Sequence, residues 1–186
     1  MTASPDRNAA RLRELLRERS LVRGDFMLAS GRRSTYYIDA RRTTMSGEGQ
    51  ALIGALGLAR LVERGWSPRA VGGLTLGADP VAYAIAHAAH AGGVPLDAFT
   101  VRQETKTHGT GRRIEGCFDP GDPVVVVEDV LTTGHSALDA VAALREAGAR
   151  ILGVFAVVDR EEGGSAAIEA AGHSLTALVT VSELGV

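Results

Sequence analysis

The stretch VVVVEDVLTTGHS, from Val124 to Ser136, holds residue types that can do chemistry. Four valines run into the adjacent acids Glu128 and Asp129, and a turn of small hydroxyl residues and glycine follows. In an open parallel sheet, ligands bind outside the carboxyl ends of the strands. Free backbone N–H groups at the start of a helix cradle anions. The acids would repel a bare phosphate, so the ligand should place hydroxyl groups or a metal ion beside its phosphate. A ribose 5-phosphate meets both requirements.

This stretch also has a purely structural interpretation, in which a strand is followed by a capped helix start and both acids are solvated. No Gly-Lys-Ser/Thr follows, so it is not a nucleotide-binding P-loop. In the ribose-phosphate interpretation, Gly134 lets the backbone close around the phosphate. Thr132, Thr133 and Ser136 add hydroxyl donors.

A second candidate is the basic segment VRQETKTHGTGRRIEG, residues 101–116. Its basic side chains lie around two hinge glycines: Arg102, Lys106, His108, Arg112 and Arg113. A mobile cationic loop can close over a charged leaving group such as pyrophosphate, stabilise its developing charge and exclude water. His108 can also donate a proton or a hydrogen bond. The alternative is a solvated basic loop, which a charge run by itself favours.

Three shorter stretches add candidates for recognition. Tyr36 and Tyr37 in FMLASGRRSTYYID can stack on a flat ring, and Arg160 in VVDREEGG can read a carboxylate with two hydrogen bonds. The glycine-rich strand end GGLTLGADP, residues 72–80, offers a second backbone cradle for anions. The structural alternatives are aromatic packing, a surface ion pair and a tight strand-to-helix turn.

Bulk properties narrow the class of protein. The chain has 186 residues, 45% of them hydrophobic and 23% charged, which predicts one globular domain. The net charge of −2 argues against nucleic-acid binding. Cys117 is the only cysteine, which excludes an internal disulfide and fits a reducing cytoplasm. No apolar run is long enough to span a membrane, and the charged N-terminus does not read as a secretory signal.

The hydrophobic pattern predicts elements that alternate between strand and helix. The apolar strands are continuous runs, as expected when helices cover both faces of a mostly parallel sheet. We expect strands at 69–74, 96–101, 123–129, 150–159 and 174–181, and helices at 5–20, 46–65, 79–93, 135–149 and 165–172. Residues 24–42 predict a hairpin-like region that turns at Gly31. Residues 103 to about 122 show no periodicity, which is typical of a functional lid or a disordered loop.

These motifs resemble a known family. VVVVEDVLTTGHS is similar to the phosphoribosyl-diphosphate motif of type I phosphoribosyltransferases. FMLASGRRSTYYID, VRQETKTHGTGRRIEG and VVDREEGG resemble, in that order, segments of orotate phosphoribosyltransferase, and GGLTLGADPVA is similar to its bacterial form. The resemblance spans about residues 26–160. It implies the type I fold in a single domain, with a small N-terminal hood over about 1–45, a core over about 46–186 and a mobile catalytic loop over about 103–116.

The resemblance also implies an activity. Ribose 5-phosphate would pass from phosphoribosyl diphosphate to orotate, giving orotidine 5′-phosphate and pyrophosphate in pyrimidine (UMP) biosynthesis. It implies Mg²⁺ bound through substrate oxygens, without direct protein ligands. It further implies a cytoplasmic homodimer in which the loop of one subunit closes over its neighbour's site.

Roles carry over by position. Phosphoribosyl diphosphate would contact Arg102, Gln103, Lys106, His108, Glu128, Asp129, Val130, Leu131, Thr132, Thr133, Gly134, His135 and Ser136. Orotate would contact Thr132, Arg160, Tyr36 and Tyr37. The catalytic candidates are Lys106, His108 and Asp129. No covalent nucleophile is expected, because positioning and cationic stabilisation of the leaving group suffice for an oxocarbenium-like transition state.

Two positions depart from the family pattern. Position 103 is Gln where the family loop usually carries Lys, and a lost charge-assisted contact is worth about 1.5–3 kcal/mol. Position 29 is Ala where some members carry Lys. Two alternative functions follow, a transferase for another base or a non-catalytic regulator that binds phosphoribosyl diphosphate. The presence of Lys106 and His108 argues against the regulator, as does the absence of a DNA-binding segment.

Overall fold

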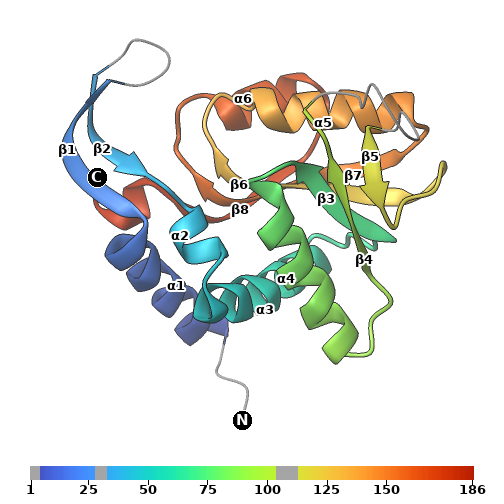
Figure 1. The fold of residues 1–186 in the computed structure, drawn as a ribbon, viewed down its shortest axis with the longest axis horizontal. Coiled ribbons are helices and arrows are strands. Elements are labelled where there is room, and N and C mark those ends of the chain that lie inside the picture. The colour runs from blue at the N-terminus through green and yellow to red at the C-terminus, as the bar shows by residue number, and fades with distance from the viewer. Residues whose placement is uncertain (1–4, 28–32, 104–112) are drawn as a thin grey trace.

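The computed structural model describes residues 5–27, 33–103 and 113–186, and its centre is a six-stranded sheet between two layers of helices (Figure 1). The strand order is β5-β4-β3-β6-β7-β8, and every neighbouring pair is parallel except β4 and β5. The strands are β3 (Ala70–Leu74), β4 (Asp97–Val101), β5 (Ile114–Gly116), β6 (Pro123–Leu131), β7 (Arg150–Asp159) and β8 (Leu175–Thr180). This architecture confirms the predicted fold class.

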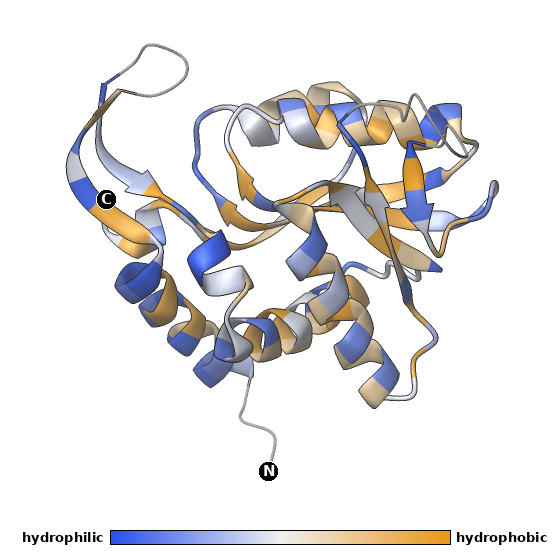
Figure 2. Cartoon of the chain, viewed as in Figure 1, coloured by the Kyte–Doolittle hydropathy of each residue, from blue (hydrophilic) through white to orange (hydrophobic). Residues whose placement is uncertain are grey.

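Helices cover both faces of the sheet. α1 (Pro5–Arg19), α3 (Gly47–Glu63) and α4 (Ala78–Ala91) lie on one face, and α5 (His135–Glu146) and α6 (Gly164–Ala170) lie on the other (Figure 1). Apolar residues are concentrated in the strands and on the inner sides of the helices, whereas polar residues face outward (Figure 2). Among the described residues, no helix combines the length and apolar character needed to cross a bilayer.

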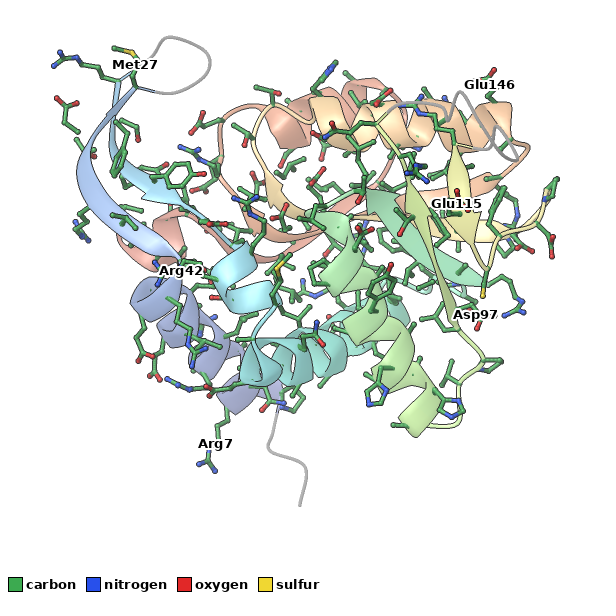
Figure 3. The ribbon with its side chains drawn as sticks, in the orientation of Figure 1. Arg7, Met27, Arg42, Asp97, Glu115 and Glu146 are labelled. Atoms are coloured by element: carbon green, nitrogen blue, oxygen red, sulfur yellow. The ribbon has the colours of Figure 1, made fainter. Side chains whose placement is uncertain are left out.

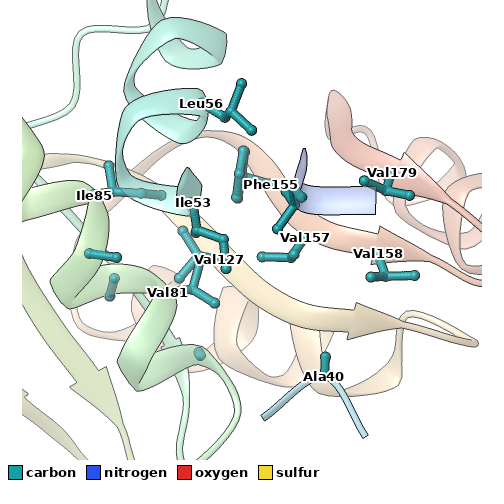
Figure 4. Close-up of a cluster of buried hydrophobic side chains, with 14 of the residues drawn as sticks. Ala40, Ile53, Leu56, Val81, Ile85, Val127, Phe155, Val157, Val158 and Val179 are labelled. Carbon is teal, nitrogen blue, oxygen red and sulfur yellow. The ribbon is translucent and has the colours of Figure 1, made fainter. Parts of the chain in front are cut away.

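The valines of β6 explain why this strand is central. Successive side chains of a strand point to opposite faces. Val125 and Val127 accordingly join the cluster under α3 and α4, while Val124 and Val126 join the cluster under α5. All four are fully buried. Figure 4 shows Val127 against Ile53 of α3 and other side chains of the first cluster. A continuous apolar run is therefore what a strand covered on both faces requires.

The N-terminal part is built differently. β1 (Leu21–Met27) and β2 (Arg33–Ile38) form a separate antiparallel pair, and α2 (Arg41–Thr44) follows them. The hairpin extends away from the main sheet, and Met27 near its outer end projects into solvent (Figures 1 and 3). The predicted turn at Gly31 and the departure at Ala29 lie outside the described residues. The division into a hood over 1–45 and a core over 46–186 stays a prediction.

The last residues of the chain return to this hairpin. A short 3₁₀ helix, η1 (Ser182–Leu184), lies beside α1 and β1 (Figure 1). The Nε of Arg17 donates to the carbonyl of Leu184 at 3.2 Å, and its Nη2 donates to the carbonyl of Glu183. Arg23 donates from Nη2 to the carbonyl of Gly185 at 3.0 Å. The C-terminal residues thus connect the hairpin to the body of the fold.

One expectation about local structure was incomplete. The segment at 103–122, expected to have no regular structure, contains β5, which pairs with β4 from Phe99↔Gly116 to Val101↔Ile114. Three residues are too few to show a period of two. A strand this short forms because the edge of β4 offers unpaired backbone groups, and its existence depends on that neighbour.

Candidate functional site

A cavity of about 440 Å³ opens at the carboxyl ends of the central strands, beneath β2. Its walls come from five separate parts of the chain. They are residues 37–41 from the end of β2 and the start of α2, residues 74–77 from the end of β3 and the loop after it, Gln103 after β4, Glu128, Asp129, Val130, Thr132 and Ser136 from β6 and its turn, and Arg160 after β7. Helices and strands far apart in sequence therefore bring most of the predicted groups to one place.

Glu128 and Asp129 form the acidic floor of the cavity. The Glu128 side chain is buried, and this burial, reinforced by the charge of Asp129, raises the pKa of Glu128 to about 8. Burial also raises the pKa of Asp129, although the Val130 N–H donates to its Oδ1 at 2.9 Å and opposes that rise. Near neutral pH, burial therefore keeps Glu128 largely protonated. A ligand that offers hydroxyl donors or a cation favours the ionised form of both acids.

The turn after β6 forms a small hollow next to the acids. This hollow has a volume of about 50 Å³ and is lined by Glu128, Val130, Leu131, Thr132, Thr133, Gly134, His135 and Ser136. Gly134 has φ of 82° and directly precedes α5. A Cβ there would also lie 3.2 Å from the Gly164 carbonyl, so glycine permits this tight entry into the helix. The predicted strand–turn–helix unit is present, with its N–H groups at the helix start available to an anion.

The β3–α4 loop approaches the acids from the other side. A Cβ on Gly77 would lie 2.4 Å from Oδ1 of Asp129, so only glycine allows this contact. The loop is anchored by Asp79, which accepts hydrogen bonds from Thr75 Oγ1 at 2.6 Å and from Thr100 Oγ1 at 2.8 Å. The sequence indicated the glycine-rich cradle but not the role of Asp79. That role depends on Thr100, which belongs to the next strand.

Arg160 is enclosed rather than solvent-exposed. Only 7% of its surface is accessible, and its guanidinium carbon lies 5.2 Å from the ring centre of Tyr36. Nη2 of Arg160 lies 2.7 Å from Oε1 of Glu162, yet neither Nε nor Nη2 has an aligned hydrogen-bond acceptor among the described residues. Tyr36 therefore supports Arg160 from beside the cavity. Tyr37, which lines the cavity, packs against Phe26 with ring centres 5.8 Å apart.

At the two described ends of the basic segment, Arg102 and Arg113 contact each other and nearby acids instead of the cavity. Arg102 does not line the cavity but pairs with Glu115 at 3.2 Å, and its N–H donates to the Arg113 carbonyl. Arg113 in turn pairs with Asp139 of α5 at 2.5 Å. Gln103 does line the cavity, and its Nε2 donates to the Thr75 carbonyl at 3.5 Å. Lys106 and His108 lie outside the described residues, so their roles stay predictions.

Two charged residues of the wall were not indicated by the sequence. Asp39 and Arg41 follow β2, and the Nε of Arg41 donates to Oδ1 of Asp39 at 2.8 Å. Their place depends on how the hairpin is set against the sheet, which no local pattern reveals. Within the part of the chain that the structure describes, no group of three or more His, Cys, Asp or Glu side chains is arranged to hold a metal ion.

Comparisons with known proteins show which proteins this chain is similar to. No family model matches the chain. It is 50% identical over 177 residues to the orotate phosphoribosyltransferase of Aquifex aeolicus, covering 94% of this chain and 96% of that protein. The Corynebacterium glutamicum protein of the same name is also 50% identical, over 95% of this chain and 93% of its own. The crystal structure of Mycobacterium tuberculosis orotate phosphoribosyltransferase with 5-phospho-α-D-ribosyl 1-diphosphate superposes with a TM-score of 0.81 at 45% identity, over 96% of this chain and 99% of that one.

Proposed function

This chain belongs to the orotate phosphoribosyltransferase family, and we propose that its cavity transfers ribose 5-phosphate from 5-phosphoribosyl 1-diphosphate to orotate. One observation carries the assignment of the site. A buried acid beside a half-buried one, a phosphate-sized turn and a buried arginine meet at one cavity at the carboxyl ends of the strands. These three features match the ribose, the phosphate and the carboxylate of the two substrates.

The sugar phosphate occupies the β6–α5 end of the site. Glu128 and Asp129 accept hydrogen bonds from the ribose hydroxyls, which return both acids to the ionised state that burial disfavours. The 5′-phosphate lies in the turn 132–136, where backbone N–H groups and the hydroxyls of Thr132, Thr133 and Ser136 donate to it. The negative charge of Asp129 also stabilises the positive charge that develops on the ribose ring in the transition state.

Orotate lies between Arg160 and the hairpin. Its carboxylate receives hydrogen bonds from the guanidinium of Arg160, whose Nε and Nη2 have no aligned acceptor among the described residues. Tyr37 and Thr132 line the pocket around the ring. Tyr36 contacts Arg160 and not orotate, because its ring lies against the Arg160 guanidinium instead of in the cavity.

The chemistry is a substitution at C1′ of the ribose. The C1′–O bond breaks and its electron pair leaves with pyrophosphate, the bond from C1′ to the orotate ring nitrogen forms, and the proton of that nitrogen passes to the departing pyrophosphate or to solvent. Lys106 and His108 stabilise the leaving charge, with Arg102 released from Glu115 to join them and Gln103 at the cavity wall. Enclosure of the site by residues 103–116 would exclude water.

Mg²⁺ fits this site as a partner of the substrate. The two adjacent acids at the cavity floor are oxygen donors of the kind that Mg²⁺ prefers, and they are too few to hold it alone. When bound, Mg²⁺ supplies positive charge to the pyrophosphate and ribose oxygens. We further propose a cytoplasmic homodimer, with residues 1–45 as a hood and the 103–116 loop shared between subunits.

A spectrophotometric assay tests the proposed function. Purified protein is mixed with orotate, phosphoribosyl diphosphate and Mg²⁺, and loss of orotate absorbance is followed while pyrophosphate is measured in parallel. We expect stoichiometric loss of orotate and release of pyrophosphate. Turnover of uracil or a purine without turnover of orotate would overturn the proposal.

A further inference from the structure

Glu162 places a carboxylate against the guanidinium that we propose binds the substrate carboxylate. Its Oε1 lies 2.7 Å from Nη2 of Arg160, and the two side chains are only 13% and 8% exposed. We propose that Glu162 is a specificity-determining residue, an internal counter-charge on Arg160 that lowers the affinity of the site for a base bearing a carboxylate while leaving an uncharged base unaffected. This inference rests on the proposed function.

The burial of the pair makes its charge effective. Among ion pairs between described residues, the other partners are at least 27% exposed, whereas both members here lie well below that value. Exposed pairs are screened by solvent and contribute little. A pair removed from water interacts strongly, so the Glu162 carboxylate reduces the positive potential that Arg160 presents to a ligand.

The pair neutralises Arg160 without satisfying its hydrogen-bonding groups. Nε and Nη2 form the edge of a guanidinium that a planar carboxylate grips with two parallel hydrogen bonds. Both nitrogens are buried and lack an aligned acceptor among the described residues, even though Glu162 is close. A substrate carboxylate that reaches these two nitrogens would make hydrogen bonds that Glu162 does not make. It must either displace Glu162 or bind beside its negative charge.

Several contacts that hold the surrounding loop do not involve the Glu162 carboxylate. The Arg160 N–H donates to the Leu131 carbonyl at 2.9 Å, and Asp159 accepts from the Glu161 N–H at 2.8 Å and from Ser165 Oγ at 2.5 Å. Tyr36 supports the guanidinium on its face. Removing the charge of Glu162 should therefore leave Arg160 in place, so the effect is electrostatic and not a collapse of the loop.

The test compares Glu162→Gln with wild type in equilibrium binding of two nucleotides, orotidine 5′-phosphate and uridine 5′-phosphate. These ligands differ only in the ring carboxylate. We expect Glu162→Gln to bind orotidine 5′-phosphate roughly tenfold more tightly, because a buried like charge has been removed, and to change uridine 5′-phosphate binding less than twofold. Glu162→Asp, which keeps the charge but withdraws it by one methylene, should tighten orotidine 5′-phosphate by a smaller factor.

Glu161→Gln is the matched control. It removes the same charge one residue away, from an exposed side chain that accepts hydrogen bonds from Ser182. It should leave both affinities unchanged. Weaker binding of both nucleotides by Glu162→Gln would show a structural role, and unchanged orotidine 5′-phosphate binding would show no electrostatic role; either overturns the inference. If wild type does not prefer orotidine 5′-phosphate over uridine 5′-phosphate, the assignment of Arg160 in the proposed function fails instead.

Discussion

The cavity joins two regions that are built by different physical means. At the carboxyl end of the sheet, β6 is paired on both sides by β3 and β7, and its four consecutive valines at 124–127 are fully buried. In the hairpin, β1 and β2 pair only with each other, and most of their residues are exposed or half-buried. The carboxyl end of the sheet carries the acids and the turn that we propose binds the phosphate, whereas the hairpin carries the two tyrosines. One region is preorganised by the core, and the other depends on a few peripheral contacts.

This difference suggests that the two regions are held in place to different degrees. Local stability varies within a protein with the number of buried contacts. We expect the carboxyl end of the sheet, which many buried contacts hold in place, to position the sugar phosphate, because its transition state needs exact positioning of charges. The hairpin is joined to the body through α1 and through Arg17 and Arg23, which hold the carbonyls of residues 183–185. We expect the hairpin, which fewer contacts hold in place, to allow the base to enter and leave.

The largest effect on activity is expected at Gly77, where the β3–α4 loop lies against Asp129. Gly77→Ala would place a methyl group 2.4 Å from Asp129 Oδ1, although the backbone at Gly77, with φ of −63°, accepts alanine. We expect kcat/KM to fall at least roughly 100-fold, since a misplacement of about 1 Å has that effect. The control is Gly47→Ala, where the added Cβ meets nothing within 4 Å. Near-normal activity of Gly77→Ala would show that Asp129 tolerates movement.

The second effect concerns the stability of the acidic floor. The pKa of Glu128 is about 8 in the folded protein, against an ordinary value of 4.5. The folded state therefore binds more protons between these pH values, and wild-type stability falls as the pH rises from 4.5 to 8. Glu128→Gln stays neutral, so it should be more stable than wild type by about 5 kcal/mol at pH 8.5 and nearly equal at pH 4.5.

Urea unfolding at the two pH values checks this expectation. Glu146→Gln, on the exposed surface of α5, is the control and should show no such pH-dependent gain. An equal stability change for Glu128→Gln at both pH values would mean that Glu128 is solvated in the folded protein. The carboxyl end of the sheet would then not differ from the hairpin in holding a buried acid ready for its ligand.

The hairpin should respond with a smaller and more selective change. Arg17→Ala removes the donors to the carbonyls of Glu183 and Leu184 and loosens the attachment of β1. We expect KM for orotate to rise about fivefold, consistent with loss of roughly one hydrogen bond, while KM for phosphoribosyl diphosphate stays within about twofold. Arg19→Ala, on the exposed side of α1, should change neither. Equal changes in both KM values would remove the distinction between the two regions.

The smallest effect is expected from Gln103→Lys. Gln103 lines the cavity and donates a long 3.5 Å hydrogen bond to the Thr75 carbonyl. A lysine there should lower KM for phosphoribosyl diphosphate about threefold, and added salt should reduce this gain because it screens exposed charges. A higher KM at all salt concentrations would indicate that the β3–α4 loop is organised around the Gln103 amide.

Much of the carboxyl end of the sheet could be predicted, because the residues that indicate it are contiguous in the sequence. The valine run, the acids at its end and the turn before α5 are contiguous, and the structure brings residues 128–136 to the cavity as expected. Arg160 was likewise predicted from its place at a strand end. The predicted helices and the parallel strands also follow from periodicity and apolar runs. The roles of Lys106 and His108 stay predictions.

The remaining features depend on contacts between distant residues. No local pattern shows that Tyr36 lies against Arg160, that Arg102 pairs with Glu115, or that β5 forms on the edge of β4. The sequence by itself determined the parallel strands, the long helices and the residue types of the β6 turn, since these follow from apolar runs, helical periodicity and contiguous residues along the chain. Only the tertiary structure decided which side chains face the cavity and which pair with one another, because burial and charge partners are set by elements that lie far apart in the sequence.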